Sequence, residues 1–159
     1  MSAFLGVIVG GVLALIGSFA AKIWDEWRQA VSLRGAFRAE IAGLLAIAEA
    51  RKHEAFIVES IAAWKSGNDS PVNFFGLEHA GRVPVFTANV GAIGTIGRQL
   101  AEEVTAFYTQ LLAVLVTIQA FEDGKMQSLP LPARIALAED ALAIWRKAKA
   151  EGAVLVAKL

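Results

Sequence analysis

The sequence predicts an all-α protein in which one N-terminal transmembrane helix continues into a small cytoplasmic helical bundle. The 159-residue chain is 56% hydrophobic, and its mean hydropathy is +0.53. No charged side chain occurs before Lys22. Beyond that point apolar residues recur at helical spacing, and no segment shows the alternation of a strand. So apolar a composition is typical of a chain that lipid solvates in part.

The first 23 residues form the predicted transmembrane helix. A run of about twenty apolar or small residues makes a helix of about 30 Å, which matches the hydrocarbon core of a bilayer. A helix satisfies its own backbone hydrogen bonds, as a segment in lipid must. Amphipathic rings favour the membrane interface, and long basic side chains can reach the headgroups. We therefore predict that the interface is marked by Lys22, Trp24, Trp27 and Arg28.

Positive charge follows this span, at Lys22, Arg28, Arg34 and Arg38. The positive-inside rule then predicts an N-terminus outside the cell and a cytoplasmic C-terminal domain. A cleaved signal peptide is the alternative, because residues 18–20 fit the small-x-small cleavage pattern. The chain lacks a basic n-region, and its apolar run exceeds the usual signal core of roughly 7–15 residues. These features favour a retained anchor.

Small residues form a ridge along the predicted span. Glycine and alanine let two helix backbones approach closely, so packing drives their association in lipid. Such residues are also common in membrane helices for other reasons. We predict that helix association, with another copy or with a different membrane protein, uses Gly6, Gly10, Ala14, Gly17 and Ser18.

The cytoplasmic part divides into a juxtamembrane stalk helix, residues 24–65, and a helical remainder, residues 66–159. No proline interrupts the stalk, which either continues straight from the span or kinks near Gly35. Residues 66–71 form a turn signal, and residues 72–83 show no period. Further helices are predicted from Pro84 to Val90, from Arg98 to about Glu122, and from Pro130 or Pro132 to near Lys149 or beyond. Glycines at 91, 94 and 97 break the chain before the second of these, which Thr95 can cap.

The sequence contains no assembled catalytic or cofactor site. Cysteine is absent and the formal net charge is zero, which excludes thiolate chemistry and gives no general drive towards nucleic acid. The Gly91, Gly94 and Gly97 spacing matches neither the Walker loop nor the dinucleotide fingerprint. The two histidines, His53 and His79, lack the further ligands that a metal site needs. We therefore expect no cofactor, no metal and no enzymatic activity.

One segment has a pattern of its own. It comprises Pro84-Val-Phe86, Asn89, Gly91, Ile93-Gly94, Ile96 and Phe107-Tyr108. This pattern resembles one found in small, uncharacterised bacterial membrane proteins with a single N-terminal span and helix-rich remainder. The resemblance covers residues 84–108. It implies a structural turn between two helices, no activity, and a place in the bacterial inner membrane.

Together these observations favour a non-enzymatic, membrane-anchored helical protein that acts as a self-associating scaffold. An accessory subunit of a larger integral-membrane complex is the alternative, since the same ridge can pack on another protein. An oligomeric pore or lysis-type channel is less favoured, because Ser2 and Ser18 are the polar residues of the span and would line a conducting path poorly. The bilayer and a second copy, or another membrane protein, are the expected partners.

Overall fold

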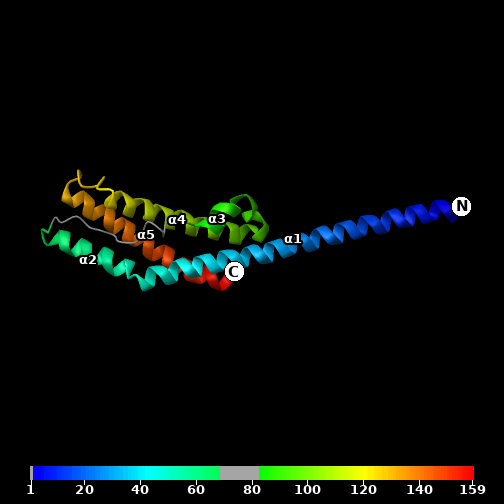
Figure 1. Cartoon of the computed structure of the whole chain (residues 1–159), viewed down its shortest axis with the longest axis horizontal. Coiled ribbons are helices and arrows are strands. Elements are labelled where there is room, and N and C mark those ends of the chain that lie inside the picture. Colours follow the sequence, from blue (N-terminus) through cyan, green and yellow to red (C-terminus); the bar gives the residue numbers. More distant parts are fainter. Residues whose placement is uncertain (1, 69–82) are drawn as a thin grey trace.

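The protein is a long helix that carries a helical head at its C-terminal half (Figure 1). The computed structural model describes residues 2–68 and 83–159, without the side chains of residues 2–10, 12 and 14. Within these ranges all regular structure is helical, as the sequence predicts. The helices are α1 (Ser2–Ala50), α2 (His53–Lys65), α3 (Pro84–Asn89), the 3₁₀ helix η1 (Val90–Ile96), α4 (Arg98–Glu122) and α5 (Leu131–Lys158).

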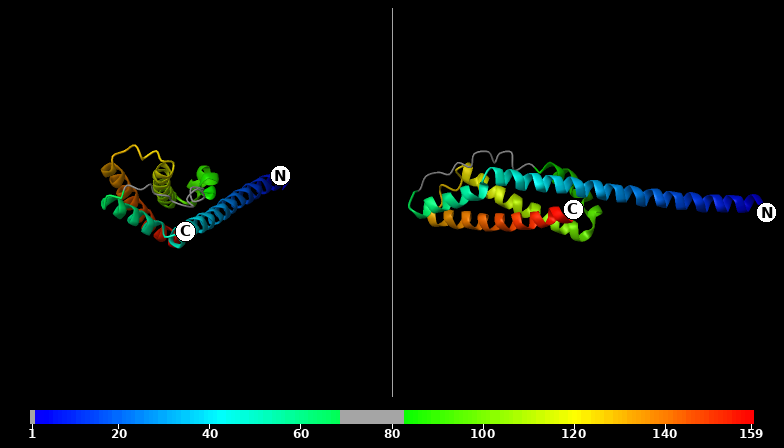
Figure 2. Two further views of the ribbon diagram at one scale, coloured as in Figure 1. Left: turned by 60° about the vertical axis from the view of Figure 1, so that its left-hand side comes forward. Right: turned by 90° about the horizontal axis from the view of Figure 1, so that it is seen from below.

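Helix α1 is 49 residues long, which at 1.5 Å per residue corresponds to about 73 Å. It passes Gly35 without interruption, so the straight continuation from residues 2–23 into the stalk is the alternative that the structure adopts. Its first half projects from the head as a bare helix, and its second half lies along the head (Figures 1 and 2). The first buried side chain is that of Leu33, which marks where the head begins.

The predicted stalk over residues 24–65 is not one helix. It breaks after Ala50, where Lys52 adopts a left-handed backbone conformation (φ 54°), and α2 then starts at His53. At the break the Lys52 amide donates to the Glu49 carbonyl, and the Lys52 carbonyl accepts the first hydrogen bond of α2, from the Phe56 amide. Residues 51 and 52 are therefore the turn between two helices, and His53 and Glu54 form the start of α2.

Helix α5 organises the head, because it packs against α1, α2 and α4. It runs to Lys158, beyond Lys149, near which the sequence predicted its earliest end. Ala141, Trp145 and Ala148 of α5 are buried, whereas Ile144 is 37% exposed. The predicted bounds of α4 are confirmed at Arg98 and Glu122. Its apolar row is in the core, with these side chains fully buried: Val104, Phe107, Tyr108, Leu111 and Ile118.

Segment α3–η1 confirms the short helix that opens at Pro84 and the glycine-rich break that follows. The expected cap is wrong. Thr95 donates its hydroxyl to the Ala92 carbonyl, within η1, at 2.8 Å. Gly97 instead precedes α4, at φ 97°, a conformation that glycine adopts without strain. The prediction that residues 72–83 are irregular concerns residues that, apart from Val83, lie outside the described ones.

Candidate functional site

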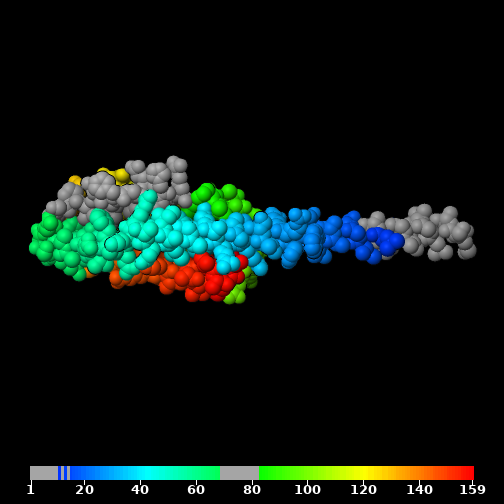
Figure 3. Space-filling model, turned by 60° about the horizontal axis from the view of Figure 1, so that its bottom comes forward, coloured from blue at the N-terminus to red at the C-terminus, as the bar shows by residue number. Residues whose placement is uncertain are grey.

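The free half of α1 carries no charged residue before Lys22, and large hydrophobic side chains are exposed along it. Large hydrophobic side chains there are 48–65% exposed, and they are Leu13, Leu15, Ile16, Phe19, Ile23, Trp24, Trp27 and Val31. Successive residues turn by about 100° around a helix, so these positions cover about half of its circumference, and the other half carries the small residues Gly11, Gly17, Ser18 and Ala21. Figure 3 shows this part of α1 standing clear of the head. A helix that is hydrophobic all round is typical of a membrane span or of the core of a larger assembly.

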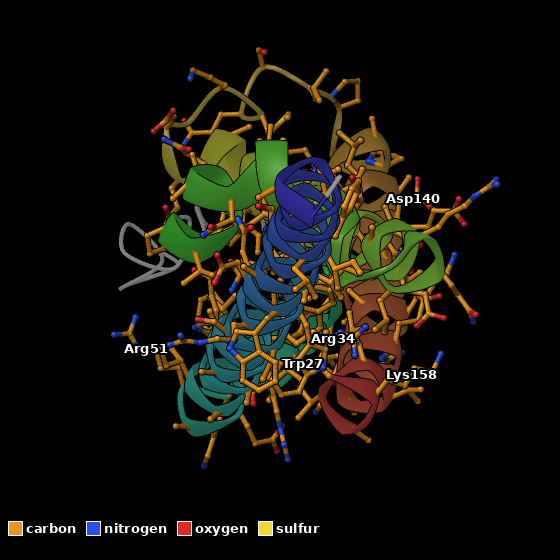
Figure 4. All side chains as sticks on the ribbon, turned by 90° about the vertical axis from the view of Figure 1, so that its right-hand side faces the viewer. Trp27, Arg34, Arg51, Asp140 and Lys158 are labelled. Atoms are coloured by element: carbon orange, nitrogen blue, oxygen red, sulfur yellow. The ribbon has the colours of Figure 1, made fainter. Side chains whose placement is uncertain are left out.

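The predicted interface residues lie at the head-proximal end of this free half. Lys22, Trp24, Trp27 and Arg28 are all exposed. The rings of Trp24 and Trp27 touch, with centroids 5.2 Å apart, and Lys22 pairs with Glu26 at 3.9 Å. Figure 4, which looks along α1 from its free end, shows Trp27 projecting from the helix. These residues form a short amphipathic collar between the charge-free segment and the head.

The predicted association ridge is described in part. Gly17 and Ser18 are exposed, and a Cβ added at Gly17 would meet no atom within 4 Å. The backbones of Gly6, Gly10 and Ala14 belong to α1, and their side chains lie outside the described residues. Where the structure describes it, the ridge is therefore uncovered by the protein itself.

A second feature, which sequence reasoning missed, fixes α3 and η1 to α1. The Glu40 carboxylate accepts hydrogen bonds from the Val85 amide (2.8 Å), the Phe86 amide (3.1 Å) and the Tyr108 hydroxyl (2.5 Å). It thereby supplies the first turn of α3 with the acceptor that no local side chain provides. The Arg34 guanidinium donates to the Ile96 carbonyl at 2.7 Å, at the end of η1.

Tyr108 completes this joint from the side of α4. Its ring is fully buried and stacks on Phe86, with centroids 4.2 Å apart. Burial, followed by the hydrogen bond to Glu40, raises the pKa of Tyr108 far above its ordinary value, so the phenol keeps its proton. A protonated phenol that donates to a carboxylate is a structural contact, and no reactive group accompanies it. We call Arg34, Glu40, Phe86 and Tyr108 the α1–α3 joint.

A third feature is a set of ion pairs that spans the break between α1 and α2. Lys149 of α5 lies 2.7 Å from the Glu49 carboxylate and 3.7 Å from that of Glu54, and Arg146 binds Glu54 at 2.8 Å. A cavity of about 320 Å³ lies beside them, next to Lys52 and the Trp145 indole. Its two lysines balance its two glutamates, so the cavity has no net charge to select an ion.

Among the described residues, no group of three histidine, aspartate or glutamate side chains could hold a metal ion. His79 lies outside these residues. Burial first, and then the charge of Arg51, lower the pKa of His53 from its ordinary value of 6.5, which leaves it neutral at pH 7. Gly91 and Gly94 belong to the 3₁₀ helix η1, and Gly97 follows its end. The neighbouring Arg98 pairs with Glu102 at 2.9 Å.

The ion pairs lower the pKa values of their glutamate carboxyls, so their contribution to stability depends on pH. The hydrogen bond from Lys149 holds the pKa of Glu49 below its ordinary value of 4.5, and Lys158 does the same for Glu103. A lowered folded-state pKa contributes stability above pH 4.5, which is lost as pH falls through the folded value. In an NMR titration of side-chain carboxyls, Lys149→Met should return the midpoint of Glu49 towards 4.5 and leave that of Glu103 unchanged. A Glu49 midpoint unaffected by Lys149→Met would contradict the pairing.

One described helix, α4, is long and apolar enough to cross a membrane by length and composition, with a mean hydropathy of 1.6 in an 18-residue window. A third of that window is buried inside the head.

Comparison of the chain with protein-family models, with curated proteins and with solved structures finds no match in any of the three. The fold and its three features therefore carry the functional argument.

Proposed function

We propose that the protein is a non-enzymatic, single-span membrane protein whose helical head is held at the cytoplasmic surface and self-associates as a scaffold. The carrying observation is that α1 is one unbroken helix of 49 residues with two different environments. Its described side chains from Gly11 to Gln29 are exposed, while its second half buries Leu33, Phe37 and Ile41 in the head. A rigid helix shared by anchor and head transmits any contact between spans to the heads.

Small residues on one side of α1 support self-association. Within the head, the outward face of α1 carries five exposed small residues, flanked by the exposed Arg38 and Ile47; the small residues are Gly35, Ala39, Ala42, Gly43 and Ala46. An added Cβ would meet nothing within 4 Å at Gly35 or at Gly43. Residues 18 apart lie five turns apart on a helix and point the same way. Gly17 and Gly35 therefore share one side of α1, and Trp24 and Arg28 separate the two patches at the collar.

Self-association is tested by disulfide cross-linking in membranes, because the natural chain has no cysteine. Ser18→Cys lies on the predicted ridge, and Phe19→Cys lies at nearly the same depth but about 100° further around α1, off the ridge. We expect Ser18→Cys to form a covalent dimer under mild oxidation and Phe19→Cys to form little. Adding Gly10→Ile and Ala14→Ile to Ser18→Cys should abolish most of the dimer, since bulk on the ridge prevents close approach. Equal dimer from both cysteines, or none from either, would refute association through this ridge.

The orientation proposed here, with the N-terminus outside and the head in the cytoplasm, is tested on intact bacterial cells. A membrane-impermeant maleimide should label Ser2→Cys and spare Val116→Cys, which is 67% exposed on α4. After permeabilisation, Val116→Cys should also be labelled. Labelling of Val116→Cys but not of Ser2→Cys in intact cells would overturn the orientation without contradicting the membrane anchor.

An accessory-subunit function is the second candidate, and α4 favours it. The outward face of α4 carries no charge from Thr105 to Val116 and includes the exposed residues Ala106, Thr109 and Ala113. A shallow hollow of about 580 Å³ lies at its start, beside Thr105 and Ala106. An uncharged helix face of this kind can pack on another protein. Purification in mild detergent would then bring down a stoichiometric second protein, whereas a pure homo-oligomer would favour the scaffold.

A further inference from the structure

We infer that the η1 turn is a second membrane contact, which rests on the interfacial layer of the bilayer leaflet from which α1 emerges. This inference depends on the proposed anchor, because α1 sets the position of the membrane. It adds to the anchor a surface that decides how the head lies against the bilayer.

The chemistry of the turn suits the membrane interface. Residues 83–97 carry no charged side chain. Within this stretch the η1 turn exposes Val90 (52% exposed), Gly91, Gly94 and Thr95 to the surroundings. Small and apolar groups with a few hydroxyls enter the headgroup boundary at low cost, whereas charged groups do not leave water easily.

The position of the turn is fixed by the α1–α3 joint. Arg34 holds the end of η1 through the Ile96 carbonyl, and Glu40 holds the start of α3 through two backbone amides. Figure 1 shows α3, η1 and the start of α4 at the end of the head that faces the free half of α1. In Figure 4, Arg34 and Lys158 lie on the side of α1 along which α5 runs, also at this end.

Helix geometry brings the turn close to the headgroups. Arg34 follows Trp27 by seven residues, which is about 10 Å along a helix. With the Trp24–Trp27 pair in the interface, where amphipathic rings prefer to lie, Arg34 holds the end of η1 at a level about 10 Å further along α1, which is just beyond the headgroup layer of about 5–8 Å per leaflet. The distance between the collar and the α1–α3 joint is fixed, because α1 is unbroken between them.

The cations beside the turn fit the same surface. Arg98 has a side chain that is 92% exposed, and Lys158 at the end of α5 is 44% exposed. Each already pairs with a glutamate, Glu102 or Glu103, so they do not form a strong anion site. Exposed pairs of this kind are weak and leave the basic groups able to contact lipid phosphates. The recognised partner is therefore a lipid surface, contacted mainly by uncharged groups.

The inference is tested with single cysteines that carry an environment-sensitive fluorophore, in the full-length chain reconstituted in phosphatidylcholine–phosphatidylglycerol liposomes. Val90→Cys reports on the turn, and Val116→Cys is the matched control on the distal part of α4 (67% exposed). Phe19→Cys reports on the anchor. The quenchers are lipids with a spin label either near the headgroup or deep in the acyl chain.

We expect the Val90 probe to be blue-shifted and quenched by the shallow spin label, and the Val116 probe to remain water-like and unquenched. The Phe19 probe should be quenched by the deep label. A deeply quenched Phe19 probe with a water-like Val90 probe would overturn the inference and leave the anchor intact. A blue-shifted Val90 probe without shallow quenching would also overturn it, in favour of contact with a second protein chain. A Phe19 probe that no lipid quenches would overturn both the anchor and this contact.

Discussion

Replacing Glu40 by alanine is expected to destabilise the head by about 3–5 kcal/mol, because three donors lose their acceptor at once. The Val85 and Phe86 amides and the Tyr108 hydroxyl all donate to this carboxylate. Tyr108 is fully buried, so water does not readily replace the lost partner. A hydrogen bond to a charged group contributes about 1.5–3 kcal/mol, and a buried donor without an acceptor costs about 1–3 kcal/mol. The loss should appear in urea unfolding of the detergent-solubilised chain.

The control for this experiment is Glu59→Ala, at an exposed position on α2. A surface substitution of this kind should change the free energy of unfolding by less than about 0.5 kcal/mol. Tyr108→Phe removes one of the three donors and should cost about 1–2 kcal/mol. In the double variant Glu40→Ala, Tyr108→Phe the two losses should not add, since the second removes a donor that the first has orphaned. Full additivity would show that Tyr108 and Glu40 do not act together.

Glu40 also shows why parts of the fold escape sequence reasoning. A glutamate in a helix with an apolar stripe is usually a solvated position. Its three partners lie 45, 46 and 68 residues further along the chain, and no local spacing connects them. The helix α4, by contrast, was predictable to its end residues, because its apolar period, the preceding glycines and the Glu-Asp-Gly ending are all local signals.

The break at Lys52 escaped prediction for a related reason. Arginine and lysine are good helix formers, and no glycine or proline is present at residues 51–52. The bend therefore arises from tertiary contacts that outweigh local preference. Helix α2 buries Ile57, Ile61 and Trp64 in the head, and Lys149 and Arg146 hold the acidic groups on either side of the turn. Such contacts are formed by α5, about a hundred residues away along the chain, as the separation of Lys149 from Glu49 shows.

Gly152→Val is expected to cost about 3 kcal/mol, because the site where α5 meets α4 and α1 has no room for a side chain. An added Cβ would lie 2.6 Å from the Phe107 ring and 3.3 Å from a Leu45 methyl group. Phe107 is 1% exposed, so its ring has nowhere to turn. From the sequence, glycine at this position suggests a helix end, whereas α5 continues to Lys158. The glycine is therefore kept for helix contact and not for backbone freedom.

Gly43→Val provides the matched control, since Gly43 also lies inside a helix and its added Cβ would meet nothing within 4 Å. Valine is the better helix former by a few tenths of a kcal/mol, so this substitution should leave stability unchanged or slightly raised. Both variants are compared by urea unfolding of the full chain in detergent, followed through the fluorescence of the buried Trp64 and Trp145. If Gly152→Val and Gly43→Val had equal effects, the helices could not approach as closely as the structure has them. The free energy difference between these two variants thus measures how closely α5 packs against Phe107 of α4 and Leu45 of α1.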